Sequence, residues 1–136
     1  MKLKERDGTL RQKIAILNFR AGKRDSAYQE LCNARLENAD LEAPEITMVN
    51  LYTEIKMLEQ AKKWVIFAIQ RNPKNSAVLF QAAQWYWNYD DLEKAKETAW
   101  EASKAQKENE ENVNLNMLLG LIAREQKNLE EAEKIF

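Results

Sequence analysis

Few side chains in this sequence could do chemistry, and their types limit what that chemistry could be. The chain has one cysteine, Cys32, and no histidine. An internal disulfide is therefore impossible, as are a zinc site of cysteine and histidine ligands and any nucleophile activated by histidine. Cys32 lies among the apolar positions of a predicted helix, where a buried, unreactive thiol is the ordinary interpretation. We predict no metal and no cofactor.

Two pairs of adjacent carboxylates could in principle act as general acid and base, Asp90-Asp91 and Glu130-Glu131. The first pair lies at a predicted helix–turn–helix junction, where aspartate caps the following helix by accepting backbone N–H hydrogen bonds. The second pair falls in the first turn of a predicted helix and suits its dipole. The sequence also has no glycine-rich phosphate loop and no HExxH motif. We therefore expect that the chain is not an enzyme.

The composition favours a single all-α domain. The chain has 136 residues, of which 45% are hydrophobic and 32% charged, with only 3 glycines and 2 prolines. Alanine, leucine, glutamate, lysine and glutamine dominate, and these are good helix formers. Sandwiches and barrels need more glycine and proline at their turns, so we expect helices throughout.

The charge pattern argues against nucleic acid, and the apolar runs argue against membrane insertion. The formal net charge is −1, and the 21 basic and 22 acidic side chains are interspersed. A nucleic-acid interface usually shows a basic stripe, which the sequence lacks. The first residues contain no apolar segment of the signal-peptide kind, and no apolar run approaches the length of a bilayer span. We expect a soluble protein, cytoplasmic by default, in a compartment that the sequence does not define.

Apolar periodicity predicts helices in antiparallel pairs. The stretch 75–102 shows this most clearly, because two amphipathic segments flank a turn at residues 88–91. The first helix carries Leu10, Ile14, Ile16 and Leu17 at a helical period. Pro73 is expected to end an earlier helix at Arg71. The predicted helices are residues 8–21, 24–37 and 45–57, then, after a turn near Leu58, a helix that holds Ala61 and Ile69 and ends at Arg71. Two helices follow within 75–102, then one that carries Val113 to Ala123 and, after a turn at Gln126-Lys127-Asn128, a last one over 129–136.

The second helix of each pair bears an alanine that recurs at a nearly constant interval. These alanines, Ala27, Ala61, Ala95 and Ala132, are 34, 34 and 37 residues apart. The three additional residues fall in a polar stretch, 104–112, where an insertion has little effect. One helical hairpin cannot bury both of its apolar faces, so neighbouring hairpins are expected to stack. The predicted units are residues 8–41, 42–75, 76–109 and 113–136, the last of them truncated.

This helix–turn–helix repeat resembles the tetratricopeptide repeat, whose pattern is W-x2-L-G-x2-Y, then A-x3-F, then P. The first unit departs most from it, with Asn18 where tyrosine is usual. The matching residues are Ile14-Ala15, Ala27, Leu31 and Ala34, then Met48-Val49, Tyr52, Ala61, Val65 and Pro73, then Leu79, Ala82-Ala83, Tyr86, Ala95 and Ala99, then Leu119-Gly120, Ala123, Ala132 and Phe136. The resemblance implies a right-handed superhelix of about four units, with the first helices on its concave side.

The resemblance also implies a function, the binding of a protein or peptide segment along the concave face. Asn50 and Gln84 are one unit apart and suit hydrogen bonding to an extended backbone. Phe19, Phe80 and Trp87 offer aromatic contacts of the kind that dominate binding energies. The side chains implied for this peptide-binding groove are Ile16, Phe19, Asn50, Phe80, Gln84, Trp87 and Met117.

The aromatic residues between 85 and 89 have a second interpretation, which is packing. Tyr86 matches a core position by its phase, and Trp85 also fits packing better than binding. For Trp87 the two interpretations stay open, because its phase places it on the predicted groove side.

One ligand of the tetratricopeptide family can be argued against. Some of these domains hold the C-terminal carboxylate of a peptide with Lys, Asn and Arg from three successive first helices. The matching positions in this sequence contain no cation, and only Asn50 fits. Without a cation the charge-assisted hydrogen bonds to a carboxylate are missing, so we predict no such clamp.

Two alternatives to a peptide-binding scaffold remain open. The chain could be a purely architectural segment of a larger multidomain protein. It would then join neighbouring domains or self-associate, for which the apolar residues after Asn128 provide an open end. A helical repeat that binds single-stranded RNA would need a basic groove, whereas the predicted groove has chiefly Arg20 and neutral amides.

Overall fold

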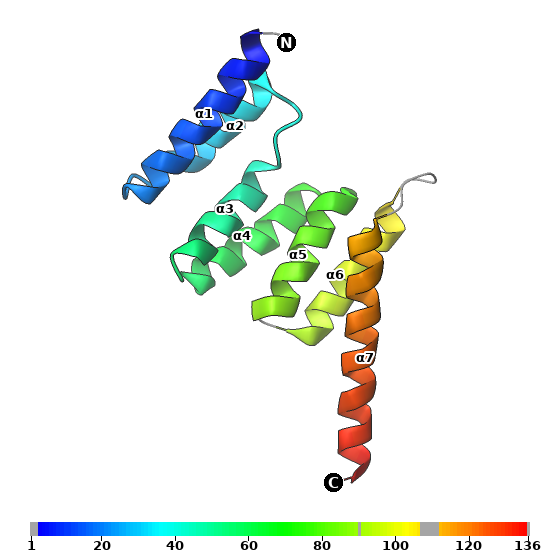
Figure 1. Cartoon of the computed structure of the whole chain (residues 1–136). Helices are drawn as coiled ribbons and strands as arrows, with labels where there is room; N and C mark the ends of the chain where they lie inside the picture. Colours follow the sequence, from blue (N-terminus) through cyan, green and yellow to red (C-terminus); the bar gives the residue numbers. More distant parts are fainter. Residues whose placement is uncertain (1–2, 90, 107–111, 136) are drawn as a thin grey trace. The chain divides into compact units, whose positions relative to one another are not determined.

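The structure is a computed structural model that describes residues 3–89, 91–106 and 112–135. Within these ranges all regular secondary structure is helical (Figure 1), which confirms the predicted all-α class. The helices are α1 (Leu3–Arg20), α2 (Ala27–Glu37), α3 (Pro44–Glu54), α4 (Leu58–Arg71), α5 (Ser76–Tyr89), α6 (Leu92–Ala105) and α7 (Val113–Ile135). The chain forms two compact units, Met1–Ala68 (unit 1) and Ile69–Phe136 (unit 2).

The turns after α1 and α3 have the same hydrogen-bonding pattern. After α1, the N–H groups of Gly22 and Lys23 donate to the carbonyls three and five residues earlier, at 3.0 and 2.8 Å. After α3, the N–H groups of Lys56 and Met57 do the same, both at 3.0 Å. Both turns are Schellman motifs, with Gly22 (φ 97°) and Lys56 (φ 65°) in the left-handed conformation. The same helix ending therefore recurs after 34 residues, the interval seen in the sequence.

Two of the predicted helix boundaries are confirmed by local geometry. Helix α4 ends at Arg71, immediately before Asn72-Pro73. At the start of α6, the Asp91 carboxylate accepts a hydrogen bond from the Glu93 backbone N–H at 2.8 Å, so Asp91 is a helix cap as predicted. Asp90 lies outside the described residues.

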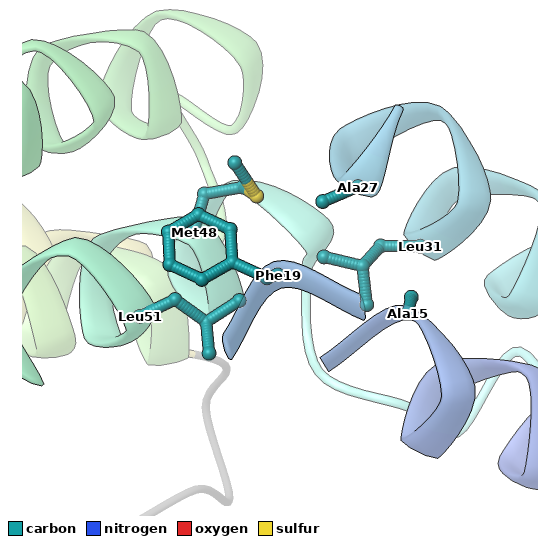
Figure 2. Close-up of a cluster of buried hydrophobic side chains, with 6 residues drawn as sticks. All are labelled: Ala15, Phe19, Ala27, Leu31, Met48 and Leu51. Atoms are coloured by element: carbon teal, nitrogen blue, oxygen red, sulfur yellow. The ribbon is translucent and has the colours of Figure 1, made fainter. Parts of the chain in front are cut away.

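The core of unit 1 is built from buried side chains of α1, α2 and α3, with α4 at its edge. Its fully enclosed members, drawn in Figure 2, are Ala15, Phe19, Ala27, Leu31, Met48 and Leu51. The Phe19 ring meets Tyr52 edge-on, with centroids 4.9 Å apart. Trp64 of α4 packs against the same cluster and contacts Tyr28 of α2, with ring centroids 4.8 Å apart. Aromatic contacts thus join α1 to α3 and α2 to α4.

The core of unit 2 forms where α5, α6 and α7 meet. Helix α5 packs along α6, and α7 contacts both. The Ser76 hydroxyl donates to the Ala102 carbonyl at 2.9 Å, which fixes the start of α5 against the end of α6. The buried side chains are Val78, Leu79, Ala82, Ala83, Trp85 and Tyr86 from α5, Ala95, Thr98, Ala99 and Ala102 from α6, and Leu115, Leu118 and Ile122 from α7.

Helix α1 buries a different face from the one that its periodicity suggests. Leu10, Ile14 and Leu17 are all exposed, whereas Ala15 and Phe19 are enclosed. Gly8 lies inside α1 rather than at its start. It allows a close approach to α2, because a Cβ added there would lie 2.7 Å from the Ala34 carbonyl oxygen. The buried face therefore includes the small residues that let two helix backbones come together.

Helix α7 is a second departure from the expected pattern. A turn was predicted at Gln126-Lys127-Asn128, but α7 continues through these residues to Ile135. The prediction of a separate helix over 129–136 is therefore wrong for the described residues. The sequence between Ala123 and Lys134 has no glycine or proline and consists mostly of good helix formers, so continuing the helix is locally favourable.

Candidate functional site

In unit 1, the predicted groove residues lie on the first helices α1 and α3. The two helices are in contact, and their C-terminal ends are joined by a bidentate ion pair between Arg20 and Glu54. Both hydrogen bonds are 3.0 Å long, and the two residues are 34 positions apart. Ile16 is half-buried beside the core, and Asn50 is exposed. A face that carries Ile16, Asn50 and this ion pair is therefore open to a partner.

Phe19 must be removed from the predicted groove. Its side chain is fully buried at the centre of the unit 1 core, against Leu51 and Tyr52 (Figure 2). The Arg24 guanidinium lies 5.5 Å from the ring centroid and covers one side of the ring. Phe19 is therefore a packing residue, and a ligand cannot reach it without opening the core.

In unit 2, three predicted groove residues share one face of α5. Phe80, Gln84 and Trp87 are spaced by four and three residues, so they form one stripe along the helix. Gln84 is exposed, and the two aromatic side chains are half-buried. On the neighbouring helix α7, Met117 is 62% exposed. The structure thus leaves an amide, two aromatic rings and a flexible thioether accessible on adjacent helices of this unit.

The neighbouring aromatic residues of α5 confirm the packing interpretation. Trp85 and Tyr86 are both buried. The Trp85 ring contacts Tyr86 and Tyr89, with centroids 5.9 and 5.5 Å apart. The Lys94 ammonium lies 5.7 Å from the Tyr86 ring centroid. Trp85 and Tyr86 therefore hold α5 in place, and Trp87 is the tryptophan of this cluster that reaches the predicted face.

The most perturbed titratable group of the described residues is Tyr28, on α2. Its hydroxyl donates to the Glu45 carboxylate at 2.8 Å, and Glu45 is itself buried at the start of α3. Burial, followed by this hydrogen bond, raises the pKa of Tyr28 well above its ordinary value. The pair lies at the junction of α2 and α3, and neither groove face includes it. Its arrangement fits a structural hydrogen bond that orients the two helices.

A groove that the sequence did not suggest lies between α6 and α7 of unit 2. It encloses about 480 Å³, and its lining is mostly apolar on α7 and mostly charged on α6. Its lining residues are Glu93, Lys96, Glu97 and Trp100 from α6, and Leu119, Ile122, Ala123 and Gln126 from α7. Trp100 is 57% exposed. The signal for this α6–α7 groove in the sequence was Trp100, a large apolar residue that lies outside the row of buried alanines on α6.

A hollow of similar size is lined by residues of α1 and α2 in unit 1. It encloses about 470 Å³, and its lining includes Leu10, Ile14 and Arg11 of α1 with Glu30 and Asn33 of α2. These are the apolar residues of α1 that were expected to face inward. The hollow is mixed in character, because charged and amide groups alternate with the leucine and isoleucine side chains.

Two further features of the described residues bear on the class of protein. Among the described residues, no three histidine, cysteine, aspartate or glutamate side chains are grouped so that they could hold a metal ion. In the same part of the chain, no helix combines the length and the apolar character needed to cross a membrane. The fold and these faces define an all-helical protein with exposed faces on adjacent helices. No protein-family model matches the chain, and neither a curated protein nor a solved structure matches it.

Proposed function

We propose that this chain is a non-catalytic scaffold of the tetratricopeptide type, which binds an extended segment of another protein through its first helices. The observation that carries the proposal is the recurrence of structure after 34 residues in unit 1. The Schellman turns at Gly22 and Lys56 are one interval apart, and the Arg20–Glu54 ion pair joins equivalent positions. Repeated hairpins of this kind present similar side chains at equivalent positions of each unit.

The accessible polar groups on the proposed surface support a peptide rather than a small molecule as the ligand. Asn50 and Gln84 are both exposed, and they occupy equivalent positions one interval apart on α3 and α5. Each amide can both donate and accept a hydrogen bond, as a peptide backbone requires. Trp87 and Phe80, half-buried on α5, supply apolar surface beside Gln84. The proposed ligand is an extended segment with apolar side chains, and no cofactor takes part.

The test uses peptides selected from a displayed random library on the wild-type chain. Binding is then measured to an Asn50→Ala, Gln84→Ala double variant. The matched control is Gln60→Ala, Gln70→Ala, which removes two exposed amides from the second helix α4 instead. Two lost hydrogen bonds of about 1 kcal/mol each predict a loss of affinity of roughly tenfold or more. Equal affinity for the double variant and the control, at equal helicity, would show that the first helices are not the binding surface.

A second candidate function is supported by a different observation. Residues 123–133 of α7 are exposed, with Gln126 half-buried as the exception. This segment includes Leu129, which is 49% exposed. An amphipathic helix end of this kind favours an architectural role, in which the chain associates with itself or with a neighbouring domain.

A further inference from the structure

The α6–α7 groove has the size and the lining of a binding site for one amphipathic helix. Its lining includes the buried Ile122, the half-buried Leu119 and the exposed Ala123 and Trp100. Grooves between two helices accept a third helix through apolar side chains spaced three and four residues apart. Within the described part of unit 2, α5 lies against both helices, and no helix occupies this groove.

The repeated alanines indicate which segment belongs in such a groove. Ala27, Ala61 and Ala95 are all fully buried, each on the second helix of its pair. The fourth alanine of the series, Ala132, is exposed. Leu129, three residues earlier and on the same face of α7, is exposed as well. The distal part of α7 thus carries the apolar pattern of a second helix, and its Leu129 and Ala132 are both exposed.

The distal part of α7 cannot reach the α6–α7 groove of its own chain while α7 is continuous. Leu129 follows Ile122 by seven residues, which places it about 10 Å further along the helix axis. Figure 1 shows α7 as one uninterrupted helix whose C-terminal half extends past α5 and α6. This segment can instead reach the α6–α7 groove of a second copy. The same segment of the second copy can reach the α6–α7 groove of the first.

We infer that two copies of this chain associate through antiparallel α7 helices, each placing its Leu129 and Ala132 in the α6–α7 groove of the other. A twofold axis near Arg124 of α7 pairs equivalent parts of the two helices. With that axis, Leu129 of one copy meets Leu119 of the other. The contact is isologous, and two copies therefore close the assembly. This inference rests on the second candidate function and deepens it; it is independent of peptide binding on the first helices.

The first experiment measures the mass of the chain in solution by sedimentation over a concentration series. The expected species is a dimer, twice the 15.9 kDa of one chain. Leu129→Asp is expected to abolish the dimer over the concentrations at which the wild type is dimeric, because a carboxylate would enter an apolar groove. The control is Leu36→Asp on α2, where leucine is 85% exposed, and this variant is expected to remain dimeric. A monomeric wild type would overturn the inference.

The second experiment separates exchange between copies from a hairpin within one copy. Leu119→Cys and Leu129→Cys are introduced together with Cys32→Ser, and the protein is oxidised. A covalent dimer is the expected product, since the two new thiols of one chain meet those of the other. An oxidised monomer with an internal disulfide would overturn the inference, because the segment would then fold back on its own groove. If the chain forms the covalent dimer but binds no selected peptide, the peptide-binding proposal is refuted and the dimer stands. If the chain stays monomeric but binds a selected peptide, the dimer is refuted and the peptide-binding proposal stands.

Discussion

The turn between α3 and α4 offers a test of the repeated geometry, because the wrong kind of residue occupies its left-handed position. Lys56 has φ 65°, and its equivalent one interval earlier is Gly22, with φ 97°. Residues with a Cβ are disfavoured in this conformation, whereas glycine adopts it readily. The Lys56 side chain is exposed, so its removal loses little packing. We expect Lys56→Gly to stabilise the protein.

The magnitude follows from two opposing effects. A residue with a Cβ costs about 1–2 kcal/mol in the left-handed helical conformation. Glycine offsets part of that gain, because its greater freedom in the unfolded chain costs about 0.4–1 kcal/mol on folding. The net increase in the free energy of unfolding is about 0.5–1 kcal/mol. For a cooperative unit of this size, the corresponding rise in the midpoint of thermal unfolding is roughly 2–8 °C.

The matched control reverses the change at the equivalent turn. An added Cβ at Gly22 would have no atom within 4 Å, so Gly22→Ala introduces no clash. Its effect is purely conformational, and we expect a destabilisation of about 1 kcal/mol. Both variants are measured by circular dichroism at 222 nm during thermal and urea unfolding. A lower midpoint for Lys56→Gly, or two effects of the same sign, would refute the assignment of both turns to one Schellman geometry.

Two further predictions concern the junctions of α2 with its neighbours. Gly8→Ala should destabilise the protein by roughly 1–3 kcal/mol in urea unfolding, although alanine ordinarily favours a helix. The reason is that the added Cβ would lie 2.7 Å from the Ala34 carbonyl oxygen and 2.9 Å from the Asn38 Cβ. A gain in stability would contradict this close approach. For Tyr28, burial and the hydrogen bond to Glu45 raise the pKa, so the folded state holds the phenolic proton more tightly than the unfolded state. That contribution is fully present below the unfolded pKa of about 10 and declines as the pH rises above it. The stability advantage of the wild type over Tyr28→Phe should therefore shrink above pH 10, and an advantage that stays constant to higher pH would refute the burial argument.

The sequence predicted the elements well because strong local signals mark them. Pro73 ends α4, Asp91 caps α6, and the first three repeated alanines, on α2, α4 and α6, are buried where they were expected. These features depend on residues close in sequence, such as a proline without an N–H group or a short carboxylate beside free amides. Composition alone was enough to identify the helical class, since the chain has few of the residues that sheet proteins need at their turns.

The buried face of α1 could not be predicted in the same way. The helix has one apolar stripe with Leu10, Ile14 and Leu17, and another with Ala15 and Phe19. Periodicity detects both stripes but does not say which one a neighbouring helix covers. The close approach of α2 at Gly8 selects the stripe with the small residue, and this selection also takes Phe19 out of the predicted groove. Of the seven predicted groove residues, Phe19 is thus the one that the structure excludes from the groove, because it lies on the buried face of α1.

The distal part of α7 shows why the last predicted turn was beyond sequence reasoning. At the equivalent positions after α1 and α3 the chain turns, and the second helix that follows has its repeated alanine buried. The residues after Gln126 carry the same apolar spacing, yet they are also good helix formers with no glycine at the turn position. In an array where each unit contacts only its neighbours, the energy of such a turn comes from the packing that it permits. In the proposed dimer, the second copy supplies a helix to the α6–α7 groove, and the packing that would favour a turn in α7 is then no longer needed.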